Sequence, residues 1–194
     1  MHIMLDFETL DTGPFPVLLS IGAVVFDPAT NEVPTDPNAA ECFFRQISAQ
    51  SCINRSASVS EATIKWWLSP EREPGRAHIL DNKALPVDKI LASFIGWATT
   101  FAERDSSVVS ERCLWSHGLL ADARWLDSYM TSCGYEWPGQ LFNYRSMRDT
   151  RTVYALAQQK QFFDQVKPKI EHHPLYDCMA QAANLQRAFR VLGL

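Results

Sequence analysis

Three runs of apolar residues occupy the first quarter of the chain, and turn-forming residues separate them. The runs cover residues 2–7, 17–26 and 41–48, and the second is rich in β-branched residues. Runs of this length bounded by glycine, proline and aspartate are typical of β-strands. Residues 27–38 between the last two runs are strongly turn-like. The pattern therefore predicts an antiparallel β-meander at the start of the chain.

The remainder of the chain alternates helical spacing with short apolar runs. Helices are predicted where apolar residues recur every three or four positions or where a capping residue precedes them, at 60–68, 85–103, 119–134 and 175–192. Two short runs, 112–118 and 141–147, predict the fourth and fifth strands. Residues 69–84 are polar and carry proline and glycine, which predicts a surface loop.

This order of elements indicates one α/β domain over residues 1–194, with a mixed five-stranded sheet and helices on both faces. The net charge of −4 excludes a surface coated in positive charge, although a local basic groove remains compatible with nucleic acid. Five scattered cysteines without a CxxC pair disfavour a zinc site or a disulfide framework. The longest apolar run is too short to cross a membrane, so we expect a cytoplasmic protein with no membrane partner.

Two acids, Asp6 and Glu8, stand at the end of the first predicted strand. Side chains alternate along a strand, so both acids face one side while Phe7 faces the other. Like charges this close resist ionisation unless a cation lies between them, and Mg²⁺ or Mn²⁺ prefers carboxylate oxygen. From these residues alone, two solvated acids at a strand end remain the alternative.

Further chemistry-bearing residues lie at helix starts. Asp122 is one turn into a helix after a predicted strand, and Asp177 begins the last helix. Each could simply interact with a helix dipole. His172 precedes Asp177 by five residues, where it could accept a proton near neutral pH or be a surface histidine. Asp149 is more typical of a helix N-cap than of a metal ligand.

Three stretches, DFET, WSHGLLAD and HHPLYD, together resemble the three motifs of the DEDDh 3′–5′ exonucleases, the group of the DNA polymerase III proofreading subunit and oligoribonuclease. Asp6 and Glu8 match the first motif, Asp122 the second, and His172 and Asp177 the third. The resemblance implies an RNase H-like fold. Finer features, LSIGAVVFDPAT, TIKWWL and RDTRT, resemble the branch of phage DexA exonuclease and RNase AS.

The resemblance implies hydrolysis of single-stranded RNA or DNA from the 3′ end to nucleoside 5′-monophosphates. Two divalent ions, Mg²⁺ or Mn²⁺, would be held by Asp6, Glu8, Asp122 and Asp177, with His172 as the general base. His173 would break the motif spacing by one residue. Dimers are common in this group, so a homodimer is among the expected states. The choice between RNA and DNA stays open.

Substrate contacts are expected around the same motifs. Trp66 and Trp67 are adjacent on a predicted helix and point in different directions, so one is expected in the core and one near the terminal base, unless both are buried. Leu10 could wedge against that base. Phe7, Thr9 and His117 flank the motifs. Arg148 and Arg151 could contact phosphates, although a capped helix with solvated arginines explains them equally well. Many relatives have an asparagine near the position of His117, which leaves its role open.

Other functions fit parts of this pattern. A haloacid dehalogenase-type phosphatase has a similar DxDxT motif, but it requires an aspartate where this chain has Glu8. The fold could also serve as a catalytically inactive nucleic-acid-binding module, or as an endonuclease. The exonuclease interpretation alone uses the histidine and aspartate of HHPLYD together.

Overall fold

A five-stranded mixed sheet forms the centre of the molecule, which we describe from a computed structural model covering residues 1–80, 83–104, 109–135 and 141–194. The strand order is β3-β2-β1-β4-β5. The strands β1, β2 and β3 pair antiparallel, whereas β4 and β5 continue the sheet parallel to β1. Their bounds are β1 (His2–Thr9), β2 (Leu18–Phe26), β3 (Cys42–Gln46), β4 (Cys113–Ser116) and β5 (Met147–Asp149).

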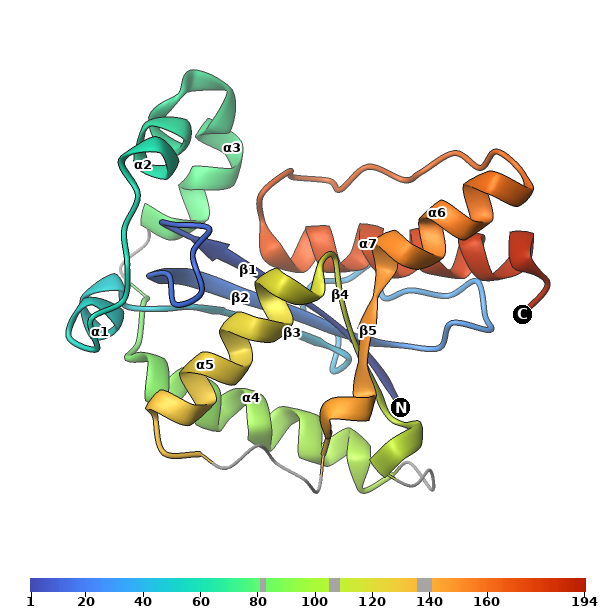
Figure 1. The fold of residues 1–194 in the computed structure, drawn as a ribbon, viewed down its shortest axis with the longest axis horizontal. Helices are drawn as coiled ribbons and strands as arrows, with labels where there is room; N and C mark the ends of the chain where they lie inside the picture. Colours follow the sequence, from blue (N-terminus) through green and yellow to red (C-terminus); the bar gives the residue numbers. More distant parts are fainter. Residues whose placement is uncertain (81–82, 105–108, 136–140) are drawn as a thin grey trace.

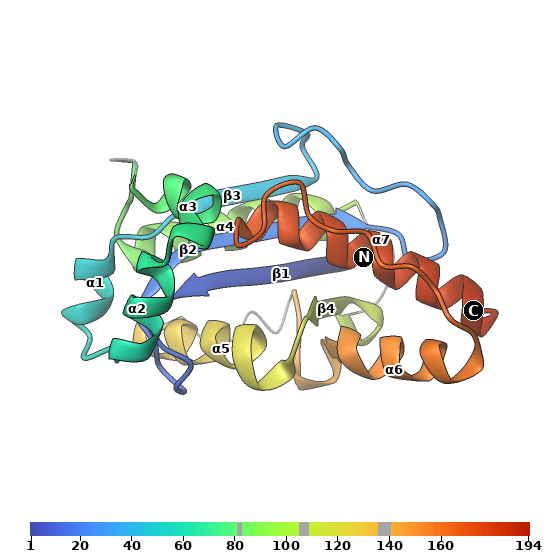
Figure 2. The same cartoon turned by 90° about the horizontal axis from the view of Figure 1, so that it is seen from above.

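Helices cover both faces of this sheet (Figures 1 and 2). The α-helices are α1 (Ala49–Ile53), α2 (Glu61–Leu68), α3 (Glu73–Arg76), α4 (Val87–Ala102), α5 (Arg124–Ser132), α6 (Thr150–Lys160) and α7 (Pro174–Leu192). Single helical turns lie at Pro70–Arg72, Ala77–Leu80, Val109–Glu111, Leu119–Ala123 and Tyr144–Ser146. Within the described residues, no helix combines the length and apolar character needed to span a membrane.

Alternation along β1 divides the core into two layers. Ile3, Leu5 and Phe7 pack with α4 and α5, whereas Met4 packs with α6 and α7. The α7 face therefore also receives the side chains of residues 6 and 8, as expected from the two-residue period of a strand. The predicted α/β architecture with helices on both faces is confirmed.

The start of α7 lies unusually close to β2. A Cβ atom added at Gly22 would lie 2.3 Å from the carbonyl carbon of Pro174 and 2.4 Å from the nitrogen of Leu175. Gly22 pairs with Asp6 across the β1–β2 ladder. The missing side chain therefore allows the first turn of α7 to rest beside the acidic end of β1.

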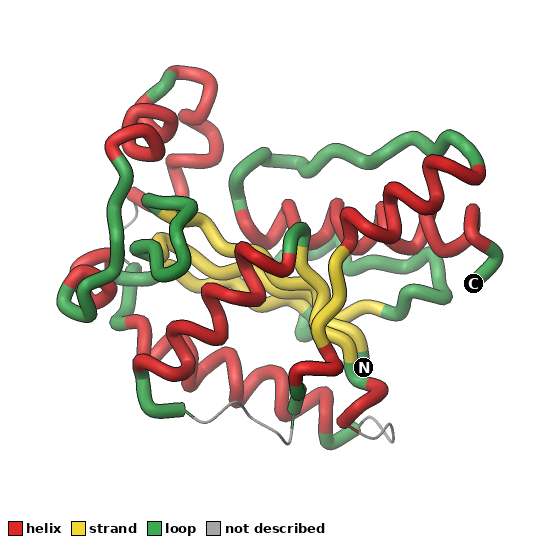
Figure 3. Tube along the Cα trace, viewed as in Figure 1, coloured by secondary structure: helices red, strands yellow, loops and turns green. Residues whose placement is uncertain are grey.

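Two predicted segments were wrong. The fifth strand lies at Met147–Asp149 rather than 141–147, because Asn143 and Ser146 cap each other's backbone and close a 3₁₀ turn before it. Most of 69–84 is helical rather than a loop, over residues 70–80 (Figure 3); residues 81–82 of that prediction lie outside the described part. The polar residues of this segment suggested a solvent-exposed loop, but the segment packs against the rest of the protein and Gly75 is buried.

The predicted cap of α6 is confirmed. The side chain of Asp149 accepts a hydrogen bond of 2.8 Å from the backbone N–H of Arg151. Helix α1 was not predicted, because it is a single short turn after β3 and carries no amphipathic period. The predicted helices at 60–68, 85–103 and 175–192 begin within two residues of α2, α4 and α7.

Replacing Gly22 by alanine should separate α7 from β2. We expect Gly22→Ala to lower the free energy of unfolding by about 1–3 kcal/mol, the usual cost of overpacking. Each kcal/mol lost should lower the melting temperature by about 2–4 °C. Gly96→Ala is the matched control, because Gly96 lies in α4 with no atom within 4 Å of the added Cβ. The free energy of unfolding of Gly96→Ala should be higher than that of wild type by about 0.5–1 kcal/mol, because alanine is the better helix former. Equal melting temperatures for Gly22→Ala and the wild type would contradict the close approach.

Candidate active site

Four carboxylates from three separate segments gather beside the carboxyl end of β1. Asp6 and Glu8 lie on β1, Asp122 on the helical turn after β4, and Asp177 in the first turn of α7. Oδ1 of Asp122 accepts a hydrogen bond of 3.0 Å from the backbone N–H of Phe7, directly between the two β1 acids. This contact fixes the turn after β4 to the end of β1, as expected where neighbouring parallel strands end together.

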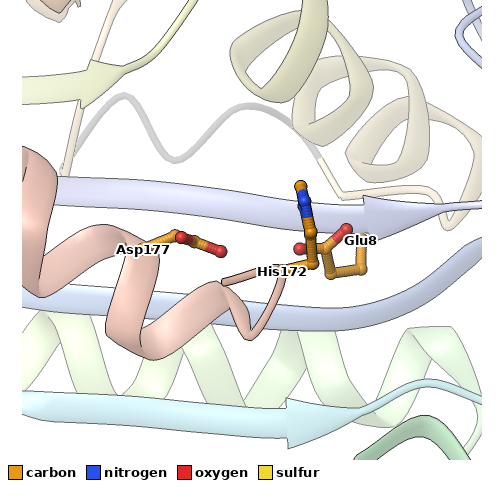
Figure 4. Close-up of side chains that lie close together, drawn as sticks. All are labelled: Glu8, His172 and Asp177. Atoms are coloured by element: carbon orange, nitrogen blue, oxygen red, sulfur yellow. The ribbon is translucent and has the colours of Figure 1, made fainter. Parts of the chain in front are cut away.

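A histidine completes the cluster. Glu8, His172 and Asp177 each offer a ligand atom, and these atoms all lie within 4.8 Å of one another. Figure 4 shows the His172 ring and the Glu8 carboxylate side by side, with Asp177 projecting from α7. One oxygen of Asp177, Oδ2, is buried and has no hydrogen-bond partner among the described residues. A buried carboxylate oxygen without a donor is a position that a cation would satisfy.

Burial dominates the electrostatics of these acids. It is the largest cause that raises the pKa of all four, to about 7 for Asp122 and Asp177 and well above the ordinary value for Asp6 and Glu8. Repulsion from neighbouring carboxylates raises the pKa of Asp6 and Glu8 further. The four groups therefore cannot all ionise easily without added positive charge, and their hard oxygen ligands fit a divalent cation such as Mg²⁺ or Mn²⁺.

Gln181 is a contact of this cluster that sequence reasoning missed. Its Nε2 donates a hydrogen bond of 3.2 Å to Oδ1 of Asp6, which lowers the pKa of that acid slightly against the larger effects of burial. Gln181 follows Asp177 by four residues on α7. That spacing places both on one helix face, and it is the signal that would have identified Gln181.

The two adjacent histidines have different surroundings. His172 has a left-handed backbone, with φ of 62°, and its ring lies at the acids. The ring of His173 packs instead against Phe44 and Tyr176, with centroid separations of 4.4 and 4.7 Å. Burial, followed by the charge of Arg72, lowers the pKa of His172. The structure thus brings the ring of His172, rather than that of His173, to the carboxylates, and the lowered pKa of His172 favours the neutral imidazole.

A pocket of about 480 Å³ opens next to Glu8. Trp67 is 3% exposed, and its Nε1 donates a hydrogen bond of 2.8 Å to the carbonyl of Thr9, whereas Trp66 is 36% exposed. Leu10 is partly buried against the core and is not part of the lining. The pocket is lined by Phe7, Glu8, Thr9, Thr12, Ser60, Ala62, Thr63, Trp66, Trp67 and Trp125.

The remaining candidates lie in different places. His117 accepts or donates a hydrogen bond of 2.8 Å with Thr150 and lines a groove of about 310 Å³ that also contains Asp177 and Gln181. Arg148 is not brought to the acids, because its guanidinium donates to the carbonyls of Arg145 and Met147. Arg151 is closer, and its positive charge lowers the pKa of Asp122.

Three solved structures with a similar fold are nucleases. Cell-death related nuclease 4 (CRN-4) is 13% identical, with a TM-score of 0.62, over 97% of this chain and 63% of that one. The zinc-bound E. coli ExoI–ssDNA complex is 12% identical, with a TM-score of 0.58, over 99% and 42%. The nuclease domain of 3′hExo, a DEDDh family member bound to rAMP, is 15% identical, with a TM-score of 0.57, over 97% and 91%.

These likenesses identify the fold as that of RNase H-like exonuclease domains, although the chain spans only part of CRN-4 and ExoI. A comparison with curated proteins gives no match. The family model of the 3′-5′ exoribonuclease Rv2179c-like domain matches residues 1–189, a range that includes every member of the acidic cluster and His172. Fold, motif order and family model agree, and the chain belongs to the 3′-5′ exoribonuclease Rv2179c-like domain family.

Proposed function

We propose that this protein hydrolyses single-stranded RNA or DNA from the 3′ end and releases nucleoside 5′-monophosphates. The observation that carries the proposal is the convergence of four buried or half-buried carboxylates and the ring of His172 from separate segments. Such a concentration of acids is unfavourable for folding, and active sites are where such costs are retained. The family description supports the 3′-5′ direction and RNA as a substrate.

Asp6, Glu8, Asp122 and Asp177 would hold two divalent ions, Mg²⁺ or Mn²⁺. When bound, the ions would supply positive charge for the scissile phosphate and for the attacking and leaving oxygens. The unpartnered Oδ2 of Asp177 and the raised pKa values of the acids support this role. Gln181 and the backbone N–H of Phe7 would hold Asp6 and Asp122 in place through their hydrogen bonds.

The protein's own groups would prepare the water and the substrate. His172 would accept the proton of the attacking water, for which a neutral imidazole is required. The pocket beside Glu8 would hold the terminal nucleotide, with the exposed ring of Trp66 available for stacking on any base. The buried Trp67 would fix the end of β1 through the carbonyl of Thr9.

Metal-dependent shortening from the 3′ end is the first test. Wild-type protein should convert 5′-labelled single-stranded RNA or DNA into a descending ladder with Mn²⁺ and leave it intact with EDTA. Asp6→Asn should reduce the rate by more than about 100-fold, because loss of even an outer partner of a metal ligand costs up to about that much. The exposed acid Asp164 provides the control, and Asp164→Asn should retain wild-type activity.

Intact oligonucleotide in every lane, from folded protein, would contradict the proposal. Binding without turnover would then favour a nucleic-acid-binding module. Release of inorganic phosphate from small phosphomonoesters would favour a phosphatase.

The two histidine variants separate the base from its neighbour. His172→Ala should lower kcat by about 10²–10⁴-fold, the usual contribution of general base catalysis. His173→Ala should cost much less, because its ring packs on Phe44 and Tyr176. Steady-state rates with a labelled oligonucleotide provide the measurement. A larger loss for His173→Ala would show that the motif was assigned one residue out of register.

The acids also predict a metal-dependent effect of pH on stability. Asp122 and Asp177 titrate near 7 in the folded protein, against about 3.9 when unfolded. Their ionisation therefore destabilises the fold as pH rises from about 4 to 7 and acts in full above about 7. In EDTA, Asp122→Asn should be more stable than wild type by a clearly larger margin at pH 8 than at pH 5, because the cost of ionising Asp122 in the fold is complete only above about pH 7. Its amide oxygen can still accept from Phe7.

Melting temperatures of both proteins at pH 5 and 8, with EDTA and with Mn²⁺, provide the measurement. Mn²⁺ should stabilise wild type more at pH 8 than at pH 5, because cations and protons compete for the carboxylates. The quantity to compare is the difference in melting temperature between wild type and Asp122→Asn at each pH. This difference cancels the contribution of His78, because burial lowers its pKa to about 4 and its effect on stability therefore rises with pH. An unchanged difference between the two pH values would contradict this electrostatic account.

A further inference from the structure

The helical segment 61–80, which we call the arm, docks beside the His172 loop. Figures 1 and 2 show α2 and α3 grouped near the end of β1 and the start of α7. A Cβ atom added at Gly75 would lie 2.6 Å from the carbonyl oxygen of Glu171 and 2.9 Å from Cβ of His172. The two backbones are therefore in direct contact, and this contact holds the arm's side chains near the active site.

Arg72 is the arm residue that reaches His172. Its Nη1 lies 3.0 Å from Nε2 of His172, and the guanidinium carbon lies 4.5 Å from the centroid of the Trp66 ring. A guanidinium stacked on an aromatic face keeps its N–H groups free in its own plane. Nε of Arg72 is buried and has no hydrogen-bond partner among the described residues. Arg72 is thus held in a fixed orientation with donor capacity unused.

The present partner of Arg72 is not its best possible partner. A neutral imidazole offers one lone pair, whereas a phosphate offers charged oxygens that a guanidinium can bind in bidentate fashion. The His172 ring is within 4.8 Å of the Glu8 and Asp177 carboxylates. Only the His172 ring therefore separates Arg72 from the place where the proposed function requires a phosphodiester. The acids at that place would repel the phosphate, and the charge of Arg72 would attract it.

The contact also has a consequence for His172. The lone pair of Nε2 that faces Arg72 accepts a hydrogen bond from the guanidinium, since arginine only donates. While this bond is present, that lone pair cannot take a proton from water. Movement of Arg72 to a phosphate would release it.

We propose that Arg72 is a substrate-binding residue that exchanges His172 for a phosphate of the bound nucleotide and thereby frees Nε2 of His172. This inference rests on the proposed exonuclease function. It assigns Arg72 to the phosphate, Trp66 to the base and His172 to the water. Trp66 lines the pocket beside Glu8, and its ring lies 4.5 Å from the guanidinium carbon of Arg72 and 4.6 Å, between centroids, from the ring of His172.

Paired ligands test the assignment directly. Adenosine 5′-monophosphate and adenosine differ only in the phosphate, and their affinities can be measured by calorimetry with Mn²⁺ on the whole chain. Arg72→Met should weaken binding of the monophosphate by about 10-fold or more and change binding of adenosine less than about twofold. Arg72→Lys should recover part of the lost affinity, because it keeps the charge without the planar fork.

The control is Arg104→Met, which removes a guanidinium stacked on Phe101 at the end of α4, on the opposite face of the sheet. This variant should bind both ligands as wild type does. An equal loss of monophosphate and adenosine binding in Arg72→Met would mean that Arg72 only supports Trp66, and would overturn the inference. A normal monophosphate affinity with a reduced kcat would assign Arg72 to His172 alone, and would also overturn it.

The result is separable from the proposed function. A wild-type protein that binds the monophosphate more tightly than adenosine but leaves oligonucleotides intact would contradict the exonuclease function. The affinities of wild type and Arg72→Met for the two ligands would still test the role of Arg72. A wild-type protein that binds monophosphate no better than adenosine would overturn the Arg72 inference, whatever its turnover.

Discussion

The cost of burying four neighbouring carboxylates, Glu8 and Asp122 fully and Asp6 and Asp177 in part, is the constraint on which the arrangement of this molecule depends. Ionised groups prefer water, and each neighbour of like charge adds to the cost of burial. The fold nevertheless brings Asp6 and Glu8 from β1 together with Asp122 and Asp177 from the ends of other elements. A glycine on β2 is required for α7 to approach, and single hydrogen bonds from Phe7 and Gln181 hold two of the acids. The apolar layers on both faces of the sheet supply the stability that offsets this cost.

The same cost of burial explains why the site would suit divalent ions. Carboxylates with a pKa near 7 are partly protonated at neutral pH, so they bind a cation only by releasing protons. A bound ion would offset the cost of burying these charges. Stability and the proposed chemistry are therefore linked through one cluster, and a variant that neutralises an acid gains fold stability while it loses the site.

Sequence patterns identified the parts of this site that local rules determine. Alternation on a strand placed Asp6 and Glu8 together, and motif spacing distinguished His172 from His173. The polar segment after α2 was misread because its burial depends on one glycine that meets a distant loop, at Glu171 and His172. No period in 69–84 indicates that contact, so Arg72 could not be found from sequence. Gln181 could have been predicted from the sequence, because it lies one helical turn after Asp177 on the same face of α7.

The roles proposed for Trp66 and Arg72 bear on which nucleic acids the site would select. A stacking ring such as Trp66 accepts any base, and a guanidinium accepts any phosphate, so neither selects a sequence. Under the proposed function, selection between RNA and DNA would then depend on groups near the sugar, where the 2′-hydroxyl is both donor and acceptor. The pocket beside Glu8 carries the hydroxyls of Thr9, Thr12, Ser60 and Thr63. The hydroxyl of Thr9 donates to the carbonyl of Asp11 at 2.6 Å, so it could only accept a hydrogen bond from a 2′-hydroxyl, whereas the hydroxyls of Thr12, Ser60 and Thr63 could donate or accept.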